Sequence, residues 1–218
     1  MIRAVVFDMD GVIFDTEKLT VSFWQKVSEE LGCVNVTSHF REFMGLNPVY
    51  HRRLFLDRFG EDFPYDEFIQ CVRSRSAEHI EKNGVPVKPG LYELLDYLKQ
   101  NGYLIAVATS TRHATVLKHF TKAGITEYFD GIICGDMVEK SKPNPDIYLK
   151  AADVLKVAPQ DCMALEDSAN GLTAAYRAGM KTVMVPDLIQ PTPELRKMLF
   201  ACVSSLHDVI RLLEQEKK

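Results

Sequence analysis

Residues 3–17, RAVVFDMDGVIFDTE, place three acidic residues directly after a run of strand-forming apolar residues. Residues 4–7 are typical of a buried parallel strand, because they form a short and continuous apolar run. Asp8, Asp10 and Asp15 follow, separated by a glycine and further apolar residues. Carboxylates crowded at the end of a strand repel one another unless a cation or a reacting group compensates their charge. The rest of the sequence must supply that compensation.

Four further apolar runs share this pattern and predict buried parallel strands. They span residues 104–108, 131–134, 163–165 and 182–185. Segments with the period of an α-helix lie between the later runs. One of these segments carries an apolar stripe formed by Leu91, Leu94, Leu95 and Leu98. Strand and helix in alternation predict an α/β fold with a doubly wound parallel sheet.

Residues 16–86 interrupt this alternation, because they carry helical patterns only. Helices are predicted over residues 17–31, 49–59 and 65–82. We therefore predict an α/β catalytic core, formed by residues 1–15 and 87–218, with an inserted helical cap formed by residues 16–86. Asp15 and Thr16 on one side and the NGVPVKPG stretch, residues 83–90, on the other are the expected hinges.

Composition argues against several classes of protein. A net charge of −4 provides no basic field for nucleic acid or an anionic membrane, so a few local cations must hold an anionic substrate. No apolar run approaches the ~20 residues of a membrane span, and the chain starts with a strand rather than a signal peptide. The five cysteines are scattered and form no C-x-x-C pair, which indicates reduced thiols. We expect a cytoplasmic protein without an obligate protein partner.

Polar residues gather at the carboxyl ends of the predicted strands, where open parallel sheets bind their ligands. Acidic, hydroxyl and basic side chains take part, namely Asp8, Asp10, Thr109, Ser110, Lys142, Glu166 and Asp167. Four carboxylates are stable together at neutral pH only beside a cation, and ligation by oxygen alone favours Mg²⁺. Mg²⁺ commonly takes phosphate oxygens as further ligands, so the sequence predicts phosphoryl chemistry, in which an aspartate can be the covalent nucleophile.

Four segments carry a resemblance to a known family. DMDGV (8–12), ATSTR (108–112), SKPNPDIY (141–148) and LEDSANG (165–171) resemble the four motifs of the haloacid dehalogenase superfamily. The resemblance is to its phosphatase and phosphomutase branch, which has a small helical cap. It covers essentially the whole chain, and each motif lies at the appropriate end of a predicted strand or helix.

The resemblance implies a role for each matching residue. Asp8 would be the nucleophile and Asp10 the general acid and base. Thr109 would donate a hydrogen bond to the transferring phosphoryl group, and Lys142 would neutralise that group and orient Asp8. Because the metal-independent dehalogenases lack an aspartate at the position of Asp10, the resemblance implies phosphoryl transfer rather than cleavage of a carbon–halogen bond.

The resemblance also implies a metal site. Mg²⁺ would be held by the side chain of Asp8, the backbone carbonyl of Asp10 and the side chain of Asp167. Glu166 would be either a direct ligand or a residue just behind the ligands. Asp15, by contrast, is expected to act mainly as the N-cap of the first helix.

Other polar and aromatic residues have less specific signals. Ser110 and Thr111 are as compatible with capping the next helix as with contacting a substrate. The histidines, including His113 and His119, have no partner at metal-ligand spacing and are expected on helix surfaces. In the cap, the candidates for substrate binding are Thr20, Trp24, Gly45 and Asn47.

The cap distinguishes a hydrolase from a mutase. The core is similar to that of the β-phosphoglucomutase family, whose cap carries a histidine after the hinge and a lysine and an arginine beside a loop glycine. Thr20, Met44 and Pro48 occupy these positions here, so the cations that would fix a second phosphate are missing. This favours a phosphatase of a small phosphorylated metabolite such as a sugar phosphate. A phosphosugar mutase, with Arg73 or Arg75 on the second phosphate, is the alternative; a non-catalytic protein that binds a phosphate ligand is a remote one.

Overall fold

The computed structural model describes residues 1–33, 35–43 and 48–217. Six parallel strands form one sheet in the order β3-β2-β1-β4-β5-β6. The strands are β1 (Ala4–Phe7), β2 (Leu104–Thr109), β3 (Gly131–Cys134), β4 (Cys162–Glu166), β5 (Lys181–Met184) and β6 (Ala201–Cys202). The predicted α/β fold is confirmed, and the five predicted strands lie within a residue of their observed bounds. The sixth strand was not predicted.

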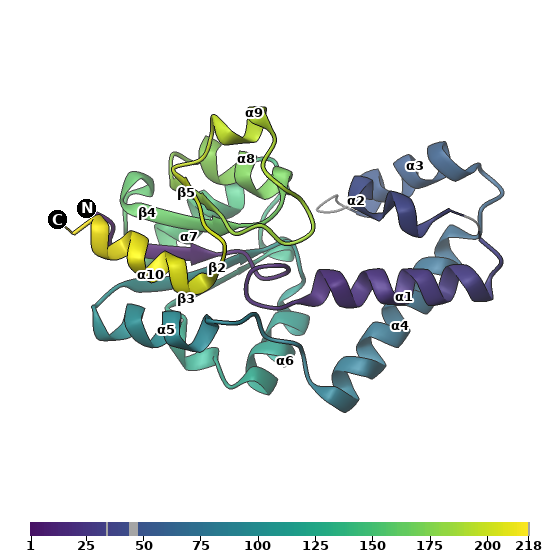
Figure 1. Cartoon of the computed structure of the whole chain (residues 1–218), viewed down its shortest axis with the longest axis horizontal. Helices are drawn as coiled ribbons and strands as arrows, with labels where there is room; N and C mark the ends of the chain where they lie inside the picture. Colours follow the sequence, from purple (N-terminus) through teal and green to yellow (C-terminus); the bar gives the residue numbers. More distant parts are fainter. Residues whose placement is uncertain (34, 44–47, 218) are drawn as a thin grey trace.

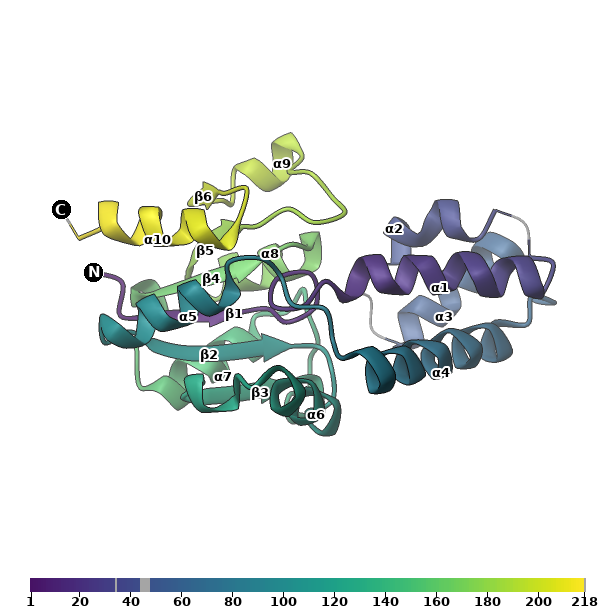
Figure 2. The ribbon, with the colours of Figure 1, turned by 60° about the horizontal axis from the view of Figure 1, so that its bottom comes forward.

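Helices cover both faces of the sheet (Figures 1 and 2). One face packs against α5 (Leu91–Gln100), α6 (His113–Ala123) and α10 (Leu206–Gln215), and the other against α7 (Asp146–Leu155) and α8 (Ala169–Arg177). The short helices of this part are α9 (Pro193–Arg196), η2 (Thr126–Tyr128), η3 (Gly135–Met137) and η4 (Pro159–Asp161). Both faces are buried, which explains why the strands consist of continuous apolar runs.

The strand order reverses around β1, which lies between β2 and β4. Phe7, the last residue of β1, is in register with Val107 on one side and Leu165 on the other. Val5 and Phe7 face the cluster beneath α5, α6 and α10, whereas Ala4 and Val6 face α7 and α8. The carboxyl ends of β1, β2 and β4 are therefore neighbours at the switch point, where ligands bind in such sheets.

The segment between β1 and α5 is a helical insertion, the name used below for residues 16–86. It contains α1 (Thr16–Glu30), η1 (Thr37–His39), α2 (Phe40–Phe43), α3 (Pro48–Phe59) and α4 (Tyr65–Asn83). Figure 1 shows it beyond one end of the sheet, and in Figure 2 the arrows of β1 and β2 point toward it. The two chain ends lie at the opposite end of the molecule (Figure 1).

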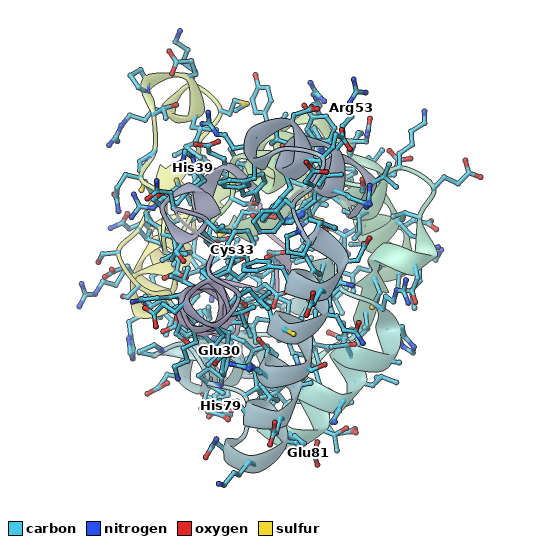
Figure 3. The ribbon with its side chains drawn as sticks, turned by 90° about the vertical axis from the view of Figure 1, so that its right-hand side faces the viewer. Glu30, Cys33, His39, Arg53, His79 and Glu81 are labelled. Atoms are coloured by element: carbon cyan, nitrogen blue, oxygen red, sulfur yellow. The ribbon has the colours of Figure 1, made fainter. Side chains whose placement is uncertain are left out.

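The helical insertion has an aromatic core of its own. Phe55 is fully buried and its ring lies 5.7 Å from that of Trp24 and 5.8 Å from that of Phe68. Edge and tilted arrangements such as these are favourable because the positive ring edge meets a negative ring face. Figure 3 views the insertion from its outer end, where Glu30 of α1 lies beside α4. Arg75 of α4 forms an ion pair with Glu30 there.

The chain crosses between the sheet and the helical insertion twice, once at residues 15–18 and once near Lys88. Ion pairs join these two crossings. Asp15 lies in the N-cap position of α1, but its side chain makes no capping hydrogen bond, so the expected capping role was wrong. Its φ and ψ of −82° and 47° lie outside the extended region that N-cap residues favour. Asp15 instead pairs with Lys18 and Lys88, each at 3.2 Å. Asp187, in the loop after β5, pairs with the same two lysines at 3.1 and 2.8 Å.

The five cysteines are all free, as expected. No helix among the described residues has the length and apolarity that a membrane span requires. The cytoplasmic location stays a prediction.

Replacing Phe55 by alanine should destabilise the protein by about 3–5 kcal/mol, because the change leaves a cavity among packed rings. Urea unfolding measures the effect. Leu149→Ala is the control, since Leu149 is 43% exposed, and should change the unfolding free energy by less than about 0.5 kcal/mol. Equal effects of the two substitutions would contradict a packed core in the insertion.

Candidate active site

Lys142 is the buried cation at the carboxyl end of the sheet. Its Nζ atom donates hydrogen bonds to Oδ1 of Asp8 at 2.6 Å, to Oε1 of Glu166 at 2.6 Å and to the carbonyl oxygen of Ala108 at 3.0 Å. The Lys142 side chain is 5% exposed and that of Glu166 is fully buried. The structure thus brings together three predicted site residues that lie far apart in the sequence.

The charges of this group depend on one another. Burial raises the pKa of Asp8 above its ordinary value, Lys142 opposes this rise, and the charge of Glu166 adds to it. Burial alone would lower the pKa of Lys142, but the negative charges of Asp8 and Glu166 outweigh it and raise that pKa above its ordinary value. Lys142 is therefore positively charged at neutral pH and offsets two buried carboxylates.

Glu166 uses both of its oxygens within the protein. Oε1 accepts hydrogen bonds from Lys142 and from the Tyr148 hydroxyl at 2.8 Å. Oε2 accepts from the backbone N–H groups of Asp167 and Ser168, each at 3.1 Å, and from the Ser168 hydroxyl at 3.0 Å. A carboxylate has about four lone-pair directions, so these donors occupy it fully. Glu166 is therefore better suited to a position behind the metal ligands than to binding a metal ion directly.

Asp167 adds a third carboxylate to this group. Carboxylate oxygens of Asp8, Glu166 and Asp167 lie within 4.8 Å of one another. Oδ2 of Asp167 is buried and has no hydrogen-bond partner among the described residues. Burial raises the pKa of Asp167 well above its ordinary value, and the charges of Glu166 and Asp8 raise it further. A buried carboxylate oxygen without a donor is costly unless a cation compensates it, so these residues fit a hard divalent ion.

Gly11 makes room for this oxygen. A Cβ atom at position 11 would overlap the carboxylate of Asp167, and the φ of +88° is itself unfavourable for residues with a side chain. The glycine of the first motif therefore permits the close approach of the segments that follow β1 and β4.

Two hydroxyl groups hold the carboxylate of Asp10. Thr16 donates to Oδ1 at 2.7 Å and Thr111 donates to Oδ2 at 2.8 Å. Thr16 is the first residue of α1, and Thr111 follows β2. Capping of α6 was one of the two roles expected of Thr111, but the N-cap residue is Arg112, and the carboxylate of Asp136 accepts from the first N–H of that helix, on His113. The position of Asp10 thus depends on both the sheet and the helical insertion.

The other predicted residues after β2 lie close by. Thr109 is almost fully buried, and its hydroxyl oxygen accepts a hydrogen bond from the Thr111 N–H at 3.1 Å. Ser110 is exposed and lines the cleft in front of the carboxylates. Thr109 and Ser110 line the same cleft as Asp8.

A cleft of about 750 Å³ lies between the carboxyl end of the sheet and the helical insertion. About half of the described residues in the wall formed by the insertion are apolar. These are Trp24, Phe40, Phe43, Val49, Ile69 and Val72. The other half are polar, namely Thr16, Glu17, Thr20, His51, Tyr65 and Arg73.

The candidates for substrate binding in the insertion have different surroundings. Trp24 borders the cleft but is only 3% exposed, and its ring packs edge-on against Phe40 at 4.8 Å, so it belongs mainly to the aromatic core. Thr20 lines the cleft and donates a hydrogen bond to the carbonyl oxygen of Thr16 at 2.9 Å. Gly45 and Asn47 lie outside the described residues.

Two further residues of the cleft were not predicted. Burial raises the pKa of Glu17 to about 8, and the charges of Asp10 and Asp8 add to the rise. His51 shares a hydrogen bond of 2.8 Å between its Nδ1 atom and the Tyr65 hydroxyl. Both residues occupy positions in helices that the sequence pattern alone assigns to a polar face.

The expected surface position of the histidines was wrong for His119. This residue is buried, and its ring meets that of Phe14 edge-on at 5.8 Å. It adjoins Phe120 on α6, so the buried face of the helix is wider than its apolar residues indicate.

Gly171→Ala should destabilise the protein by more than about 1 kcal/mol, although the same change in a helix usually stabilises by about 0.5–1 kcal/mol. The reason is that a Cβ atom at position 171 would overlap the carboxylate of Glu166. Thermal unfolding measures the sign. Thr173→Ala, on the exposed side of the same helix, is the control and should have little effect; a stabilised Gly171→Ala protein would contradict the tight packing around Glu166.

The stability of the protein should fall with decreasing pH partly through His51. Burial and the charge of Arg73 lower the pKa of His51 from 6.5 to about 4. The unfolded chain therefore takes up a proton between these two values that the folded chain does not, so stability present above pH 6.5 is lost as the pH falls toward 4. Unfolding free energies across this range should decline less steeply for His51→Asn. Parallel profiles of the variant and the wild type would refute the assignment.

Comparisons with known proteins agree with this geometry. Residues 5–185 match the model of a family described as haloacid dehalogenase-like hydrolase. The Bacillus subtilis protein YhcW is 37% identical over 193 residues, which cover 88% of this chain and 87% of that protein. The phosphorylated carbohydrates phosphatase of Thermotoga maritima is 30% identical over 185 residues, with 83% of both chains covered.

A solved structure extends the similarity to the whole fold. The crystal structure of CbbY from Rhodobacter sphaeroides in complex with phosphate has a TM-score of 0.77 and 29% identity, and the match covers 96% of each chain. The chain therefore belongs to the haloacid dehalogenase-like hydrolase family.

Proposed function

We propose that this protein is a Mg²⁺-dependent phosphatase that hydrolyses a small phosphorylated metabolite, such as a sugar phosphate, through an aspartyl-phosphate on Asp8. The observation that carries the proposal is the contact of Lys142 with Asp8 and Glu166, beside the unpartnered oxygen of Asp167. The name of the Thermotoga maritima relative supports the substrate class.

In the first half of the reaction, Asp8 attacks phosphorus. Lys142 holds Oδ1 of Asp8 and so directs the other oxygen at the substrate. Thr109 donates a hydrogen bond to a phosphoryl oxygen. Mg²⁺, held by the side chains of Asp8 and Asp167 and the backbone carbonyl of Asp10, would neutralise charge on the phosphoryl group. The new O–P bond to Asp8 forms as the P–O bond to the leaving group breaks.

Asp10 moves the protons in both halves. It gives a proton to the leaving oxygen, and then takes one from the water that hydrolyses the acyl phosphate. Thr16 and Thr111 fix the direction in which its carboxyl group points. Because Thr16 begins α1, a movement of the helical insertion would reorient this acid.

The helical insertion acts as a cap over the cleft, with residues 1–15 and 87–218 as the catalytic core. Closure of the cap buries the leaving group and excludes bulk water during the transfer. Such closure suits compact substrates, since the whole leaving group must fit under the cap.

Two observations favour hydrolysis over a mutase reaction. Thr20 hydrogen-bonds within α1 and provides no cation near the hinge. Arg75 pairs with Glu30, which lies at the outer end of the insertion (Figure 3), and is not among the described residues that line the cleft. Arg73 does line the cleft, which keeps the mutase reaction as an alternative to be assayed.

Asp8→Asn should reduce phosphate release by at least about a thousandfold while the fold stays intact, because the amide cannot attack phosphorus. The assay measures inorganic phosphate from a panel of sugar phosphates, with circular dichroism as the check on folding. EDTA should abolish the activity of the wild type, and added Mg²⁺ should restore it.

Conversion of β-glucose 1-phosphate to glucose 6-phosphate is followed in the same samples. Isomerisation without phosphate release would replace the phosphatase by the mutase. Substantial Mg²⁺-dependent release by the Asp8→Asn protein would show that another residue is the nucleophile.

A further inference from the structure

The cap side of the cleft contains one arginine whose charge is not balanced by a neighbour. Arg73, in α4, lines the cleft and is exposed. Among the described residues that line the cleft from the helical insertion, it is the only lysine or arginine. Within the same described part of the chain, its guanidinium has no hydrogen bond or ion pair. Its charge is therefore available to a ligand in the cleft.

Three of the other five arginines of the insertion have acidic partners. Arg75 pairs with Glu30, as noted above. Two more pairs on the surface of the insertion are Arg52 with Asp66 and Arg58 with Glu42. Arg73 differs from these arginines both in its lack of a carboxylate partner and in its position on the cleft.

The surroundings of Arg73 strengthen its attraction for an anion. Ile69 and Val72 of the same helix line the cleft with it, and apolar neighbours weaken the screening of a charge. The charge of Arg73 also acts on the hydrogen-bonded pair of His51 and Tyr65. Burial lowers the pKa of His51, and the positive charge of Arg73 lowers it further. At neutral pH, His51 and Tyr65 thus form an uncharged hydrogen-bonding edge beside the arginine.

The opposite wall of the cleft already has a place for one phosphoryl group. Lys142 balances Asp8 and Glu166 and is buried behind them, so its charge is largely committed to these two groups. An additional anionic group on the substrate would have to find a cation elsewhere. Arg73 faces the same cleft from the other side and meets that need.

We propose that Arg73, with His51 and Tyr65 beside it, binds the leaving group, and that it selects phosphomonoesters whose leaving group carries a second anionic oxygen group, a carboxylate or another phosphate. The inference rests on the proposed phosphatase function and names its substrate class. Arg73 acts on the leaving group as a charge-assisted hydrogen-bond donor.

The test compares substrates that differ only in the second charge. 3-Phosphoglycerate and glycerol 3-phosphate share a three-carbon skeleton, with a carboxylate in one and a hydroxymethyl group in the other. We expect the wild type to have a kcat/KM at least about tenfold higher for the acid, the difference expected of one hydrogen bond to a charged group. Glucose 1,6-bisphosphate and glucose 6-phosphate provide the same comparison for a second phosphate, and so distinguish the two sources of charge.

Arg73→Gln should lower kcat/KM by about tenfold or more for substrates with a second anionic group. For esters with one phosphate and no other anionic group, kcat/KM should stay within about threefold of the wild type. Arg73→Lys should retain part of the preference, since it keeps the charge but loses the planar fork. Arg75→Gln is the matched control, two residues along the same helix, and should change neither class of substrate.

A preference that survives in Arg73→Gln overturns the inference. So does an equal loss for both classes, which would mean that Arg73 holds the cap closed, for example against Glu139 on the core side of the cleft. The absence of a preference in the wild type has the same consequence.

A measurement of substrate binding distinguishes this inference from the proposed function. Calorimetry with the Asp8→Asn protein compares 3-phosphoglycerate and glycerol 3-phosphate, with and without Arg73→Gln. Arg73-dependent preference for the acid, in a protein whose wild type releases no phosphate, would support the anion subsite and refute the phosphatase. Phosphate release by the wild type without such a preference would refute the subsite and support the phosphatase.

Discussion

The contact of one buried lysine with two buried carboxylates is the interaction on which the site depends. Lys142 offsets Asp8 and Glu166, and neither carboxylate could stay charged in that position alone. Glu166 is fixed in turn by Tyr148 and by the turn that follows β4. The central strands of the sheet and the lysine segment ahead of α7 must therefore meet in one arrangement. Removal of either partner would leave an uncompensated charge where water is excluded.

The sheet could be predicted because its strands are buried on both faces. Such strands appear in a sequence as continuous apolar runs, as residues 4–7 do, and the helices between them repeat at the period of an α-helix. β6 escaped prediction because Ala201–Cys202 has only two residues, of which Cys202 is exposed, so no apolar run marks it. The position of His119 could not be predicted either, since a histidine on a helix has no pattern that distinguishes packing against Phe14 from exposure.

The candidate site was predicted unevenly for a related reason. Residues that immediately follow a strand, such as Asp8 and Asp167, are placed by the strand itself. The contact between Thr111 and Asp10 joins residues 101 positions apart and depends on how two loops turn, which no local spacing determines. The same is true of Glu17 and Arg73, because their relevance comes from the orientation of the helical insertion over the sheet. Helical periodicity predicts that a residue is polar and exposed, but not what it faces.

The ion pairs at the two crossings have a consequence for the motion of the insertion. Lys18 and Lys88 belong to separate crossings, yet both contact Oδ1 of Asp187, whose side chain is 2% exposed. A rotation that moves the crossings apart must break one of these pairs, and the buried carboxylate then loses part of its compensation. A rotation about an axis through Asp187 preserves both pairs. The loop after β5, which carries none of the four motifs, thereby ties together the two chain segments that join the sheet to the insertion.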